Sequence, residues 1–307
     1  MNASEKEQRA QELESQLMAF HRDAMPLTGI VPVENRLSFI WQLIDSIQRV
    51  EYVATVRSRP IAPSRLNPNS EFFDPIRAAI LLTDDDPEEA FWLVFLATHC
   101  GRNLDTEWLL ARELYGMDET APWTWTRVSS KPTAYAKWLE QRRESIQGKF
   151  GNHRKYESLK PVPKGTAAVI RSYVDWVQDS GSHQALIANA IAQANGNERV
   201  AFGILYQQMR RAVVRFGRTG GFDYLTMLAK VGLADIDADS TYMDEATGPK
   251  RGARLLFDGQ IDSHTRARVL EAKVAALEKH LGLGMQVMED SMCNWQKSPN
   301  EFVPFRG

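Results

Sequence analysis

The chain has 307 residues, of which 43% are hydrophobic and 25% are charged, a balance typical of a soluble globular protein with a sizeable core. Its formal net charge of −2 excludes the large positive excess of general nucleic-acid binders, so any contact with DNA requires a local basic patch. Two cysteines and six scattered histidines exclude a disulfide framework and a zinc-binding spacing. The longest apolar run (90–97) is too short to span a bilayer, and residues 1–18 are too charged for a signal peptide, so we expect a cytoplasmic protein.

Apolar residues recur at helical spacing along most of the chain. After an N-terminal extension (1–30), residues 36–53 carry one apolar stripe and a polar reverse face. Residues 84–100 begin with acidic residues and a proline and are apolar on all sides from Ala90 to Ala97, which predicts a central, buried helix. Further helical patterns cover 104–115, 133–147, 166–178, 183–195, 198–216, 222–231, 265–281 and 285–297. Alternating strand patterns are nearly absent, so the predicted fold is mainly α.

One polar segment interrupts the helical patterns. Residues 147–165 are rich in glycine, proline and lysine, which is typical of a linker or a long surface loop. We interpret this segment as the boundary between an N-terminal helical lobe (31–146) and a C-terminal helical lobe (166–307). The predicted organisation is therefore a two-lobed helical bundle.

Three arginines in the region 198–225 form a candidate phosphate-binding face. Arg211, Arg215 and Arg218 follow the i, i+4, i+7 spacing of one helix face, and guanidinium groups bind phosphates bidentately. The turn Thr219-Gly220-Gly221 would open the next helix with free backbone N–H groups. The alternative is a solvated basic face that pairs with acids elsewhere in the chain.

The region 246–269 resembles parts of helix-hairpin-helix DNA-binding proteins. Gly248, Pro249 and Lys250 are similar to the end of their short hairpin, whose N–H groups hold the DNA backbone, although Ala246 stands where a glycine is usual. Farther on, Asp262 lies in a stretch that resembles the one carrying the catalytic aspartate of helix-hairpin-helix DNA glycosylases. The spacing between Gly248 and Asp262 is shorter than in those enzymes. A helix N-cap at Asp262 or at the serine after it is the structural alternative.

The C-terminal pattern 285–297 combines a buried stripe with a polar one. Met285, Met288, Met292 and Trp295 share one helix face and are expected to be buried. A second face carries Asp290, Asn294 and Lys297, with Glu289 and Cys293 beside it. Buried charges are costly unless paired, so these groups either satisfy one another or line a pocket in which chemistry takes place.

Four segments of the chain together resemble one protein family. They are GMQVMEDSMCNWQKSPNEFVPFRG (284–307), RFGRTGGFDYLTML (215–228), ATGPKRGARLLF (246–257) and WLVFLATHCGR (92–102). From about Phe39 to Gly307 the chain is similar to the alpha-glutamyl/putrescinyl thymine pyrophosphorylase family, third clade. The resemblance implies a helical, DNA-glycosylase-like fold and a role in the hypermodification of thymine in DNA, in phages and in bacterial systems derived from them. The implied substrate is pyrophosphorylated 5-hydroxymethyluracil in DNA, from which an amine such as putrescine or an amino acid displaces the pyrophosphate.

This implied reaction suggests a role for each candidate residue. The target base would be flipped out of the duplex, because its 5-methylene group is inaccessible within the stack. Negative charge on the departing pyrophosphate calls for cations, and the candidates are Arg211, Arg215, Arg218, Lys250 and Arg251 with the Gly248 backbone. Cys293 is a candidate nucleophile for C6 of the base, with Lys297 favouring its thiolate and Asn294 nearby, although a structural cysteine is the common case. A carboxylate, Glu289, Asp290 or Asp262, would take the proton of the amine.

Further residues are expected to complete a base pocket. Gln42, Asp45, His99 and Trp295 are candidates for its lining, and the C-terminal tail would form one wall, with its aromatic end folded back as a seal. A lone histidine after an apolar helix is, however, more often a structural residue. No dedicated metal site is visible in the sequence, although Mg²⁺ could arrive with the pyrophosphate.

Two other functions remain open from the sequence. The first is a DNA glycosylase or lyase that excises a modified pyrimidine with Asp262 as its main catalytic residue. The second is a non-catalytic DNA-binding protein, whose binding would depend on salt but not on the modification. The sequence does not identify the amine donor, the preferred DNA sequence or the oligomeric state.

Overall fold

The computed structural model describes residues 1–305 as an assembly of α-helices and short 3₁₀ helices. Within these residues the only β pairing is an isolated bridge between Asn103 and Glu107. The mainly α prediction is therefore confirmed. The last two residues of the expected C-terminal lobe, 306 and 307, lie outside the described part of the chain. No helix among the described residues combines the length and apolar character that crossing a membrane requires.

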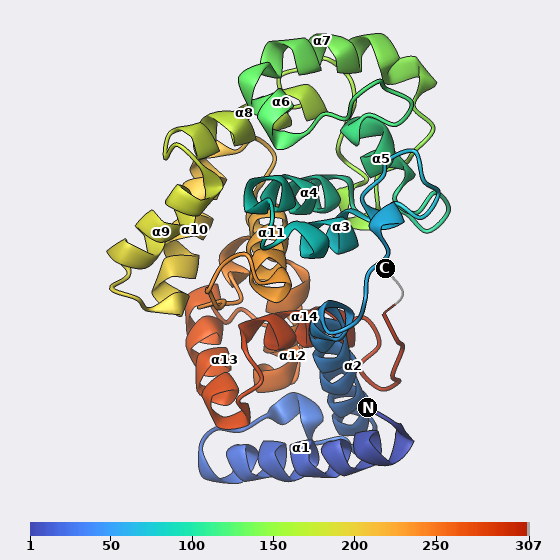
Figure 1. Ribbon diagram of the computed structural model, residues 1–307. Helices are drawn as coiled ribbons and strands as arrows, with labels where there is room; N and C mark the ends of the chain where they lie inside the picture. Colours follow the sequence, from blue (N-terminus) through green and yellow to red (C-terminus); the bar gives the residue numbers. More distant parts are fainter. Residues whose placement is uncertain (306–307) are drawn as a thin grey trace. The chain divides into compact units, whose positions relative to one another are not determined.

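The chain forms two compact units (Figure 1). Within the described residues, unit 1 contains Met1–Val53 and 238–305, and unit 2 contains Ala54–Asp237. This division differs from the expected lobes, because helices from both ends of the chain pack together in unit 1. The expected boundary at 147–165 lies inside unit 2.

Unit 1 is built from α-helices and 3₁₀ turns of both chain ends. They are α1 (Ala3–Asp23), η1 (Thr28–Ile30), α2 (Val33–Arg57, in this unit as far as Val53), η5 (Met243–Glu245), α12 (Gly248–Asp258), α13 (Ala267–Leu281) and α14 (Met285–Trp295). The first helix is an integral part of this unit, because Leu13, Leu17 and Phe20 are buried and Glu14 pairs with Arg36 of α2 at 2.8 Å.

Backbone contact between α12 and α14 organises the centre of unit 1. A Cβ atom added at Gly252 of α12 would lie 2.2 Å from the Met292 carbonyl oxygen of α14, and one added at Gly29 would lie 2.1 Å from the Leu255 carbonyl oxygen. Only glycine permits this approach, because any side chain would force the backbones apart. The two glycines therefore set how closely η1, α12 and α14 pack.

Unit 2 contains the remaining helices. They are η2 (Pro63–Arg65), α3 (Pro75–Leu82), α4 (Pro87–Cys100), α5 (Leu109–Tyr115), α6 (Trp125–Ser130), α7 (Pro132–Arg142), η3 (Arg143–Ser145), η4 (Asn152–Arg154), α8 (Thr166–Gln178), α9 (His183–Gln193), α10 (Glu198–Ala212) and α11 (Arg218–Val231). The predicted central helix is confirmed, because α4 is capped by Asp86 and every residue from Glu89 to Ala97 is buried.

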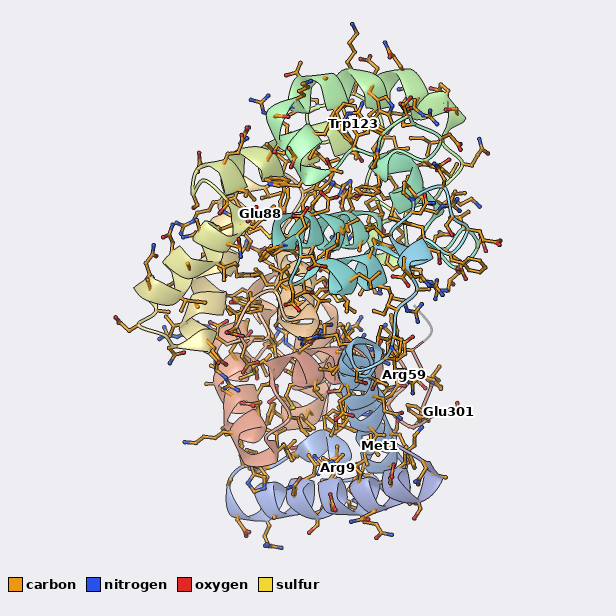
Figure 2. The ribbon with its side chains drawn as sticks, in the orientation of Figure 1. Met1, Arg9, Arg59, Glu88, Trp123 and Glu301 are labelled. Atoms are coloured by element: carbon orange, nitrogen blue, oxygen red, sulfur yellow. The ribbon has the colours of Figure 1, made fainter. Side chains whose placement is uncertain are left out.

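A chain of hydrogen-bonded polar groups joins four helices of unit 2, with three buried members and the partly exposed Glu88. Glu88 of α4, labelled in Figure 2, contacts Nδ1 of His183 at 2.7 Å, and Nε2 of His183 lies 2.6 Å from the Tyr173 hydroxyl. The Tyr173 hydroxyl lies 2.8 Å from that of Tyr224. Because each member has a partner, burial of these groups is compatible with a stable core.

The segment 147–165 lacks an α-helix, as expected of a loop, but it is packed against its own unit. The buried carboxylate of Glu113 accepts hydrogen bonds from the backbone N–H groups of Gln147 (2.9 Å) and Gly148 (2.8 Å). Arg154 is buried and pairs with Asp223 of α11 at 3.2 Å. These contacts explain why the loop does not separate two lobes.

Candidate functional site

Helix α14 presents the buried and polar faces that its sequence predicts. Met285, Met288, Met292 and Trp295 are all at most 3% exposed. The Trp295 ring packs against Phe39 with a centroid separation of 4.8 Å, and its indole N–H donates to the Pro299 carbonyl at 3.0 Å. Trp295 is therefore a core residue with a satisfied polar atom, an environment that does not favour its expected pocket role.

The polar face of α14 meets the polar face of α2. Asp290 Oδ2 accepts hydrogen bonds from the Ser46 hydroxyl at 2.8 Å and from Arg49 Nε at 3.2 Å. The guanidinium of Arg49 also pairs with Asp45, one turn earlier on α2. Asn294 donates to the other carboxylate oxygen of Asp290 at 3.0 Å. The structure thus brings the predicted residues Asp45, Asp290 and Asn294 together, with each charge partly exposed.

Lys297 extends this cluster toward the C-terminus. Its ammonium donates to Asn294 Oδ1 at 2.9 Å and lies 5.7 Å from the centroid of the Phe305 ring. The guanidinium of Arg49 lies 5.0 Å from the same ring. The cation expected to support a Cys293 thiolate is therefore engaged with Asn294 and with an aromatic ring of the tail.

The C-terminal tail folds back along α2, as its aromatic residues suggested (Figure 1). Gln42 donates its side-chain N–H to the Val303 carbonyl at 2.8 Å, and Phe302 packs on Trp41 with a centroid separation of 6.3 Å. Glu301, labelled in Figure 2, is exposed in the same segment. The tail thus covers the face of α2 that carries the predicted residues. The Oε1 atom of Gln42 is buried without a hydrogen-bond partner.

Cys293 faces a different neighbour from the Asp290 cluster. A Cβ atom added at Gly248 would lie 2.6 Å from Cys293 Sγ, so the sulfur rests against the first residue of α12. Both Cys293 and Glu289, one turn earlier, are partly buried. The set of residues expected to converge on α14 therefore divides into an α2 side and an α12 side.

The N-terminus of α12 carries the candidate hairpin residues. Its N-cap is Thr247, whose side chain makes no capping hydrogen bond to the first backbone N–H groups of the helix. Lys250 donates to the Asp244 carbonyl at 3.1 Å. The element before the helix is the single 3₁₀ turn η5 rather than a long helix, so helix-hairpin-helix similarity is confined to this local stretch.

Asp262 is a surface residue in a turn. Its carboxylate is 83% exposed and lies 3.6 Å from the guanidinium of Arg251. Helix α13 begins at Ala267 with Arg266 as its N-cap, so the alternative of an N-cap at Asp262 or Ser263 is wrong. The pattern at 265–281 therefore placed the helix within two residues of its start, and the segment before it contains a turn at 261–262.

The predicted arginine face of 198–216 does not exist as one helix surface. Helix α10 ends at Ala212, and Arg215 has a left-handed backbone with φ of 64°. Arg218 begins α11, so it lies on a different helix from Arg211. The glycines after Thr219 lie within the first turn of α11 instead of in a separate turn before it.

Local contacts engage the arginines that follow the end of this helix. Arg215 donates to the Tyr156 carbonyl at 2.6 Å and pairs with Glu157 at 3.2 Å. The guanidinium of Arg218 lies 5.3 Å from the Phe222 ring centroid. The pairing of Arg215 with Glu157 is the structural alternative that the sequence left open, in which a basic residue pairs with an acid elsewhere in the chain.

His99 is a core residue of unit 2. Its side chain is 1% exposed, and Nε2 lies 3.0 Å from the Thr166 hydroxyl. Burial, together with the nearby guanidiniums of Arg154 and Arg215, lowers the pKa of His99 to about 3, so the imidazole is neutral. This environment is that of a structural histidine, and it lies in unit 2, whereas Gln42 and Asp45 belong to unit 1.

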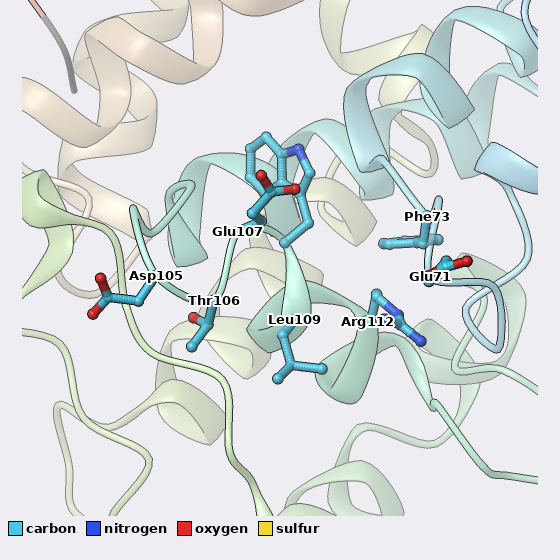
Figure 3. A pocket seen from close by; sticks show the side chains of 8 residues that line it. Glu71, Phe73, Asp105, Thr106, Glu107, Leu109 and Arg112 are labelled. Carbon is cyan, nitrogen blue, oxygen red and sulfur yellow. The ribbon is translucent and has the colours of Figure 1, made fainter.

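A separate cavity of about 340 Å³ lies in unit 2 (Figure 3). Its lining includes the carboxylates of Asp105 and Glu107 and the guanidinium of Arg112. All three charges already have partners, because Glu107 pairs with Arg102 at 2.8 Å, Asp105 pairs with Lys149 at 3.5 Å, and Arg112 donates to a backbone carbonyl. None of the residues predicted from the sequence lines this cavity.

Two residues of the α2–α14 cluster were missed as site residues. Ser46 and Arg49 continue the stripe of Gln42 and Asp45 at helical spacing, and this spacing is the signal that identifies them. The partner, Asp290, lies 241 positions away from Arg49. The sequence alone therefore reveals the polar stripe on α2 but does not reveal that this stripe contacts Asp290.

Comparison with known proteins gives one match. No curated protein and no solved structure matches this chain. A family model described as alpha-glutamyl/putrescinyl thymine pyrophosphorylase clade 3 matches residues 34–307, which include α2, α12, α14 and the tail. The chain therefore belongs to the alpha-glutamyl/putrescinyl thymine pyrophosphorylase family, clade 3, whose name indicates enzymes of thymine modification.

Proposed function

We propose that this protein replaces the pyrophosphate of pyrophosphorylated 5-hydroxymethyluracil in DNA with an amine, and that α14 carries the reaction. The observation that supports this proposal most is the division of α14 into two chemically different sides. A thiol rests against the start of α12, and a carboxylate cluster meets α2. A displacement reaction needs these two environments, one for a leaving anion and one for an entering amine.

The α12 side suits the base and its pyrophosphate. The N-terminus of a helix favours an anion through its N–H groups and its dipole. Lys250 and Arg251 lie in the first turn of α12 and add two positive charges. Mg²⁺ bound to the pyrophosphate would enter as part of the substrate.

The α2 side suits the amine. Asp45 and Asp290 share the single guanidinium of Arg49, so two carboxylates face one arginine. A substrate ammonium group would pair with one of these carboxylates, and that carboxylate can accept its proton. The Phe305 ring covers the Arg49 side of the cluster, so access for the amine would require the tail to move.

The proposed bond changes proceed through Cys293. Its thiolate sulfur forms a bond to C6 of the base, and the electron pair of the C5–C6 double bond moves onto the O4 carbonyl as an enolate. The enolate expels pyrophosphate with the electron pair of the C–O bond and leaves an exocyclic methylene group. The amine nitrogen then adds to this methylene, a carboxylate takes the proton, and the returning electron pair expels the thiolate.

The Cys293→Ser substitution tests this route. Matched DNA oligomers carrying thymine, 5-hydroxymethyluracil or the pyrophosphorylated base would be compared for binding across a salt series, and pyrophosphate release would be followed with a diamine present. We expect a preference for the pyrophosphorylated oligomer that survives the substitution, and a fall in release of at least about 100-fold.

Cys100 provides the matched control. It is fully buried in α4, where burial raises the pKa of its thiol, so Cys100→Ala should release pyrophosphate at the wild-type rate. Full release by Cys293→Ser would exclude the covalent route. Equal binding of the wild type to all three oligomers would contradict the proposed function and leave a general DNA-binding protein.

A further inference from the structure

One stretch of unit 1 concentrates positive charge in an otherwise acidic protein. Residues 248–268 contain five lysines and arginines but only two carboxylates, although the whole chain has a net charge of −2. The cations are distributed over three successive parts of the chain, namely the start of α12, the connection 259–266 and the start of α13. Such a local basic patch is what contact with DNA requires in a protein of this composition.

The connection between the two helices is held in place by α12. Arg254 donates to the Thr265 carbonyl at 3.2 Å, and Asp258 accepts a hydrogen bond from the Ser263 hydroxyl at 2.5 Å. Asp258 also pairs with Lys273 of α13 at 3.5 Å. These bonds fix one side of the connection, and the residues that alternate with them, Asp262, His264 and Arg266, are exposed.

Arg266 and Arg268 occupy an electrostatically unfavourable place. Arg266 is the N-cap of α13 and makes no side-chain capping bond, and the first turn contains no acidic residue. Both arginines are exposed, and neither has an ion-pair partner within residues 1–305. Because the N-terminus of a helix carries partial positive charge, two cations there destabilise the free protein. A bound anion would remove this conflict, and such unrelieved conflicts are typical of functional surfaces.

We propose that residues 248–268 form a surface that binds the phosphate backbone of duplex DNA, with Arg266 and Arg268 as its main contacts. A single small anion would occupy one helix N-terminus, whereas these cations extend across two helices and the connection between them. The partner therefore has several phosphates in a row. This inference rests on the proposed function, in which the substrate base lies in DNA.

The test is the double substitution Arg266→Gln with Arg268→Gln, studied in the full-length chain. Affinity for an unmodified duplex oligomer would be measured between low and physiological salt. We expect affinity to fall roughly tenfold or more and the salt dependence to decrease by about one phosphate contact for each arginine. The melting temperature of the free protein should stay the same or rise, because two cations leave the positive end of the helix dipole.

Lys279→Gln is the control, because it removes one positive charge from an exposed position in the last turn of the same helix. Its affinity and salt dependence should equal those of the wild type. An unchanged salt dependence in the double variant would overturn this surface while leaving the proposed reaction intact. Failure of the wild-type protein to bind any DNA would overturn both. A lower melting temperature in the double variant would indicate that the arginines are structural and would also overturn the inference.

Discussion

At the scale of single residues, Glu89 of α4 is a carboxylate held in the core of unit 2. It accepts hydrogen bonds from the Tyr115 hydroxyl and from the Trp125 backbone N–H, both at 2.6 Å. Burial raises the pKa of Glu89 to about 7 despite these bonds. The carboxyl group therefore keeps its proton in the folded protein at pH values where the unfolded chain has lost it.

This difference predicts a pH-dependent stability. Between the ordinary pKa of 4.5 and about 7, the folded state binds more protons at Glu89 than the unfolded state. The contribution of Glu89 is thus fully present below pH 4.5 and is lost as the pH rises toward 7, by roughly 3 kcal/mol. Melting temperatures from pH 5 to 8 should fall less steeply in Glu89→Gln than in the wild type.

The adjacent Glu88 is the control with the opposite sign. Burial alone would raise its pKa, but hydrogen bonds from His183 and Gln184 outweigh burial and lower it. Its contribution is therefore present above pH 4.5 and is lost as the pH falls, so Glu88 does not produce the fall in stability between pH 5 and 8. Parallel slopes for Glu89→Gln and the wild type would contradict the assignment of this slope to Glu89.

Residue-scale patterns in the sequence predicted part of the site. The spacing of Gln42 and Asp45 on one stripe, and of Asp290 and Asn294 on another, is enough to place each pair on one helix face. The spacing of Arg211, Arg215 and Arg218 was equally regular, yet it predicted a surface that does not exist. Arg215 has a positive φ and pairs with Glu157, which lies 58 positions away, and helical periodicity contains no information about that contact.

At the scale of secondary-structure elements, contact between α12 and α14 determines where Cys293 lies. Gly248 and Gly252 are one helical turn apart on α12, and a Cβ atom on either would overlap α14. The sequence did not reveal this role. Glycine and proline at the start of α12 resembled the end of a hairpin. The role of these glycines is instead to allow packing against α14, and such tertiary packing leaves no pattern in the local sequence.

The substitution Gly252→Ala tests this contact. Its Cβ atom would lie 2.2 Å from the Met292 carbonyl oxygen, so the helices must separate. We expect a loss of about 1–3 kcal/mol in the free energy of unfolding, measured by urea denaturation, and a lower rate of pyrophosphate release. The release rate should fall because separation moves Cys293 away from the α12 N-terminus.

Gly221→Ala offers a matched control within α11. Its added Cβ atom would meet Tyr206 at 3.5 Å, an ordinary contact, and alanine favours the helix more than glycine does. Its stability should be equal to or higher than that of the wild type. If Gly252→Ala behaved in the same way, the close approach of α12 and α14 would not matter to folding.

At the scale of the whole molecule, the sequence predicted the helical class but not the division into units. The polar loop at 147–165 resembled a boundary, whereas Gln147 and Gly148 bind Glu113 within unit 2. The ends of the chain form unit 1 together, because the tail and α14 bind α2. Such pairing across more than 240 positions leaves no local pattern, although the aromatic composition of the tail did indicate that it packs.

The chemistry proposed for the molecule also depends on this long-range pairing. The carboxylates that would receive the amine come from α2 and α14, and the helix end that would receive pyrophosphate comes from α12. All three elements belong to unit 1. The family match, over residues 34–307, includes all three elements.

The most direct measurement is product analysis of one DNA oligomer. The protein would be incubated with a duplex carrying pyrophosphorylated 5-hydroxymethyluracil and a diamine, and the nucleosides and free pyrophosphate would then be quantified. The proposed function predicts one amine-substituted nucleoside for each pyrophosphate released. An abasic site in place of the substituted base, or binding without any change in the base, would contradict it.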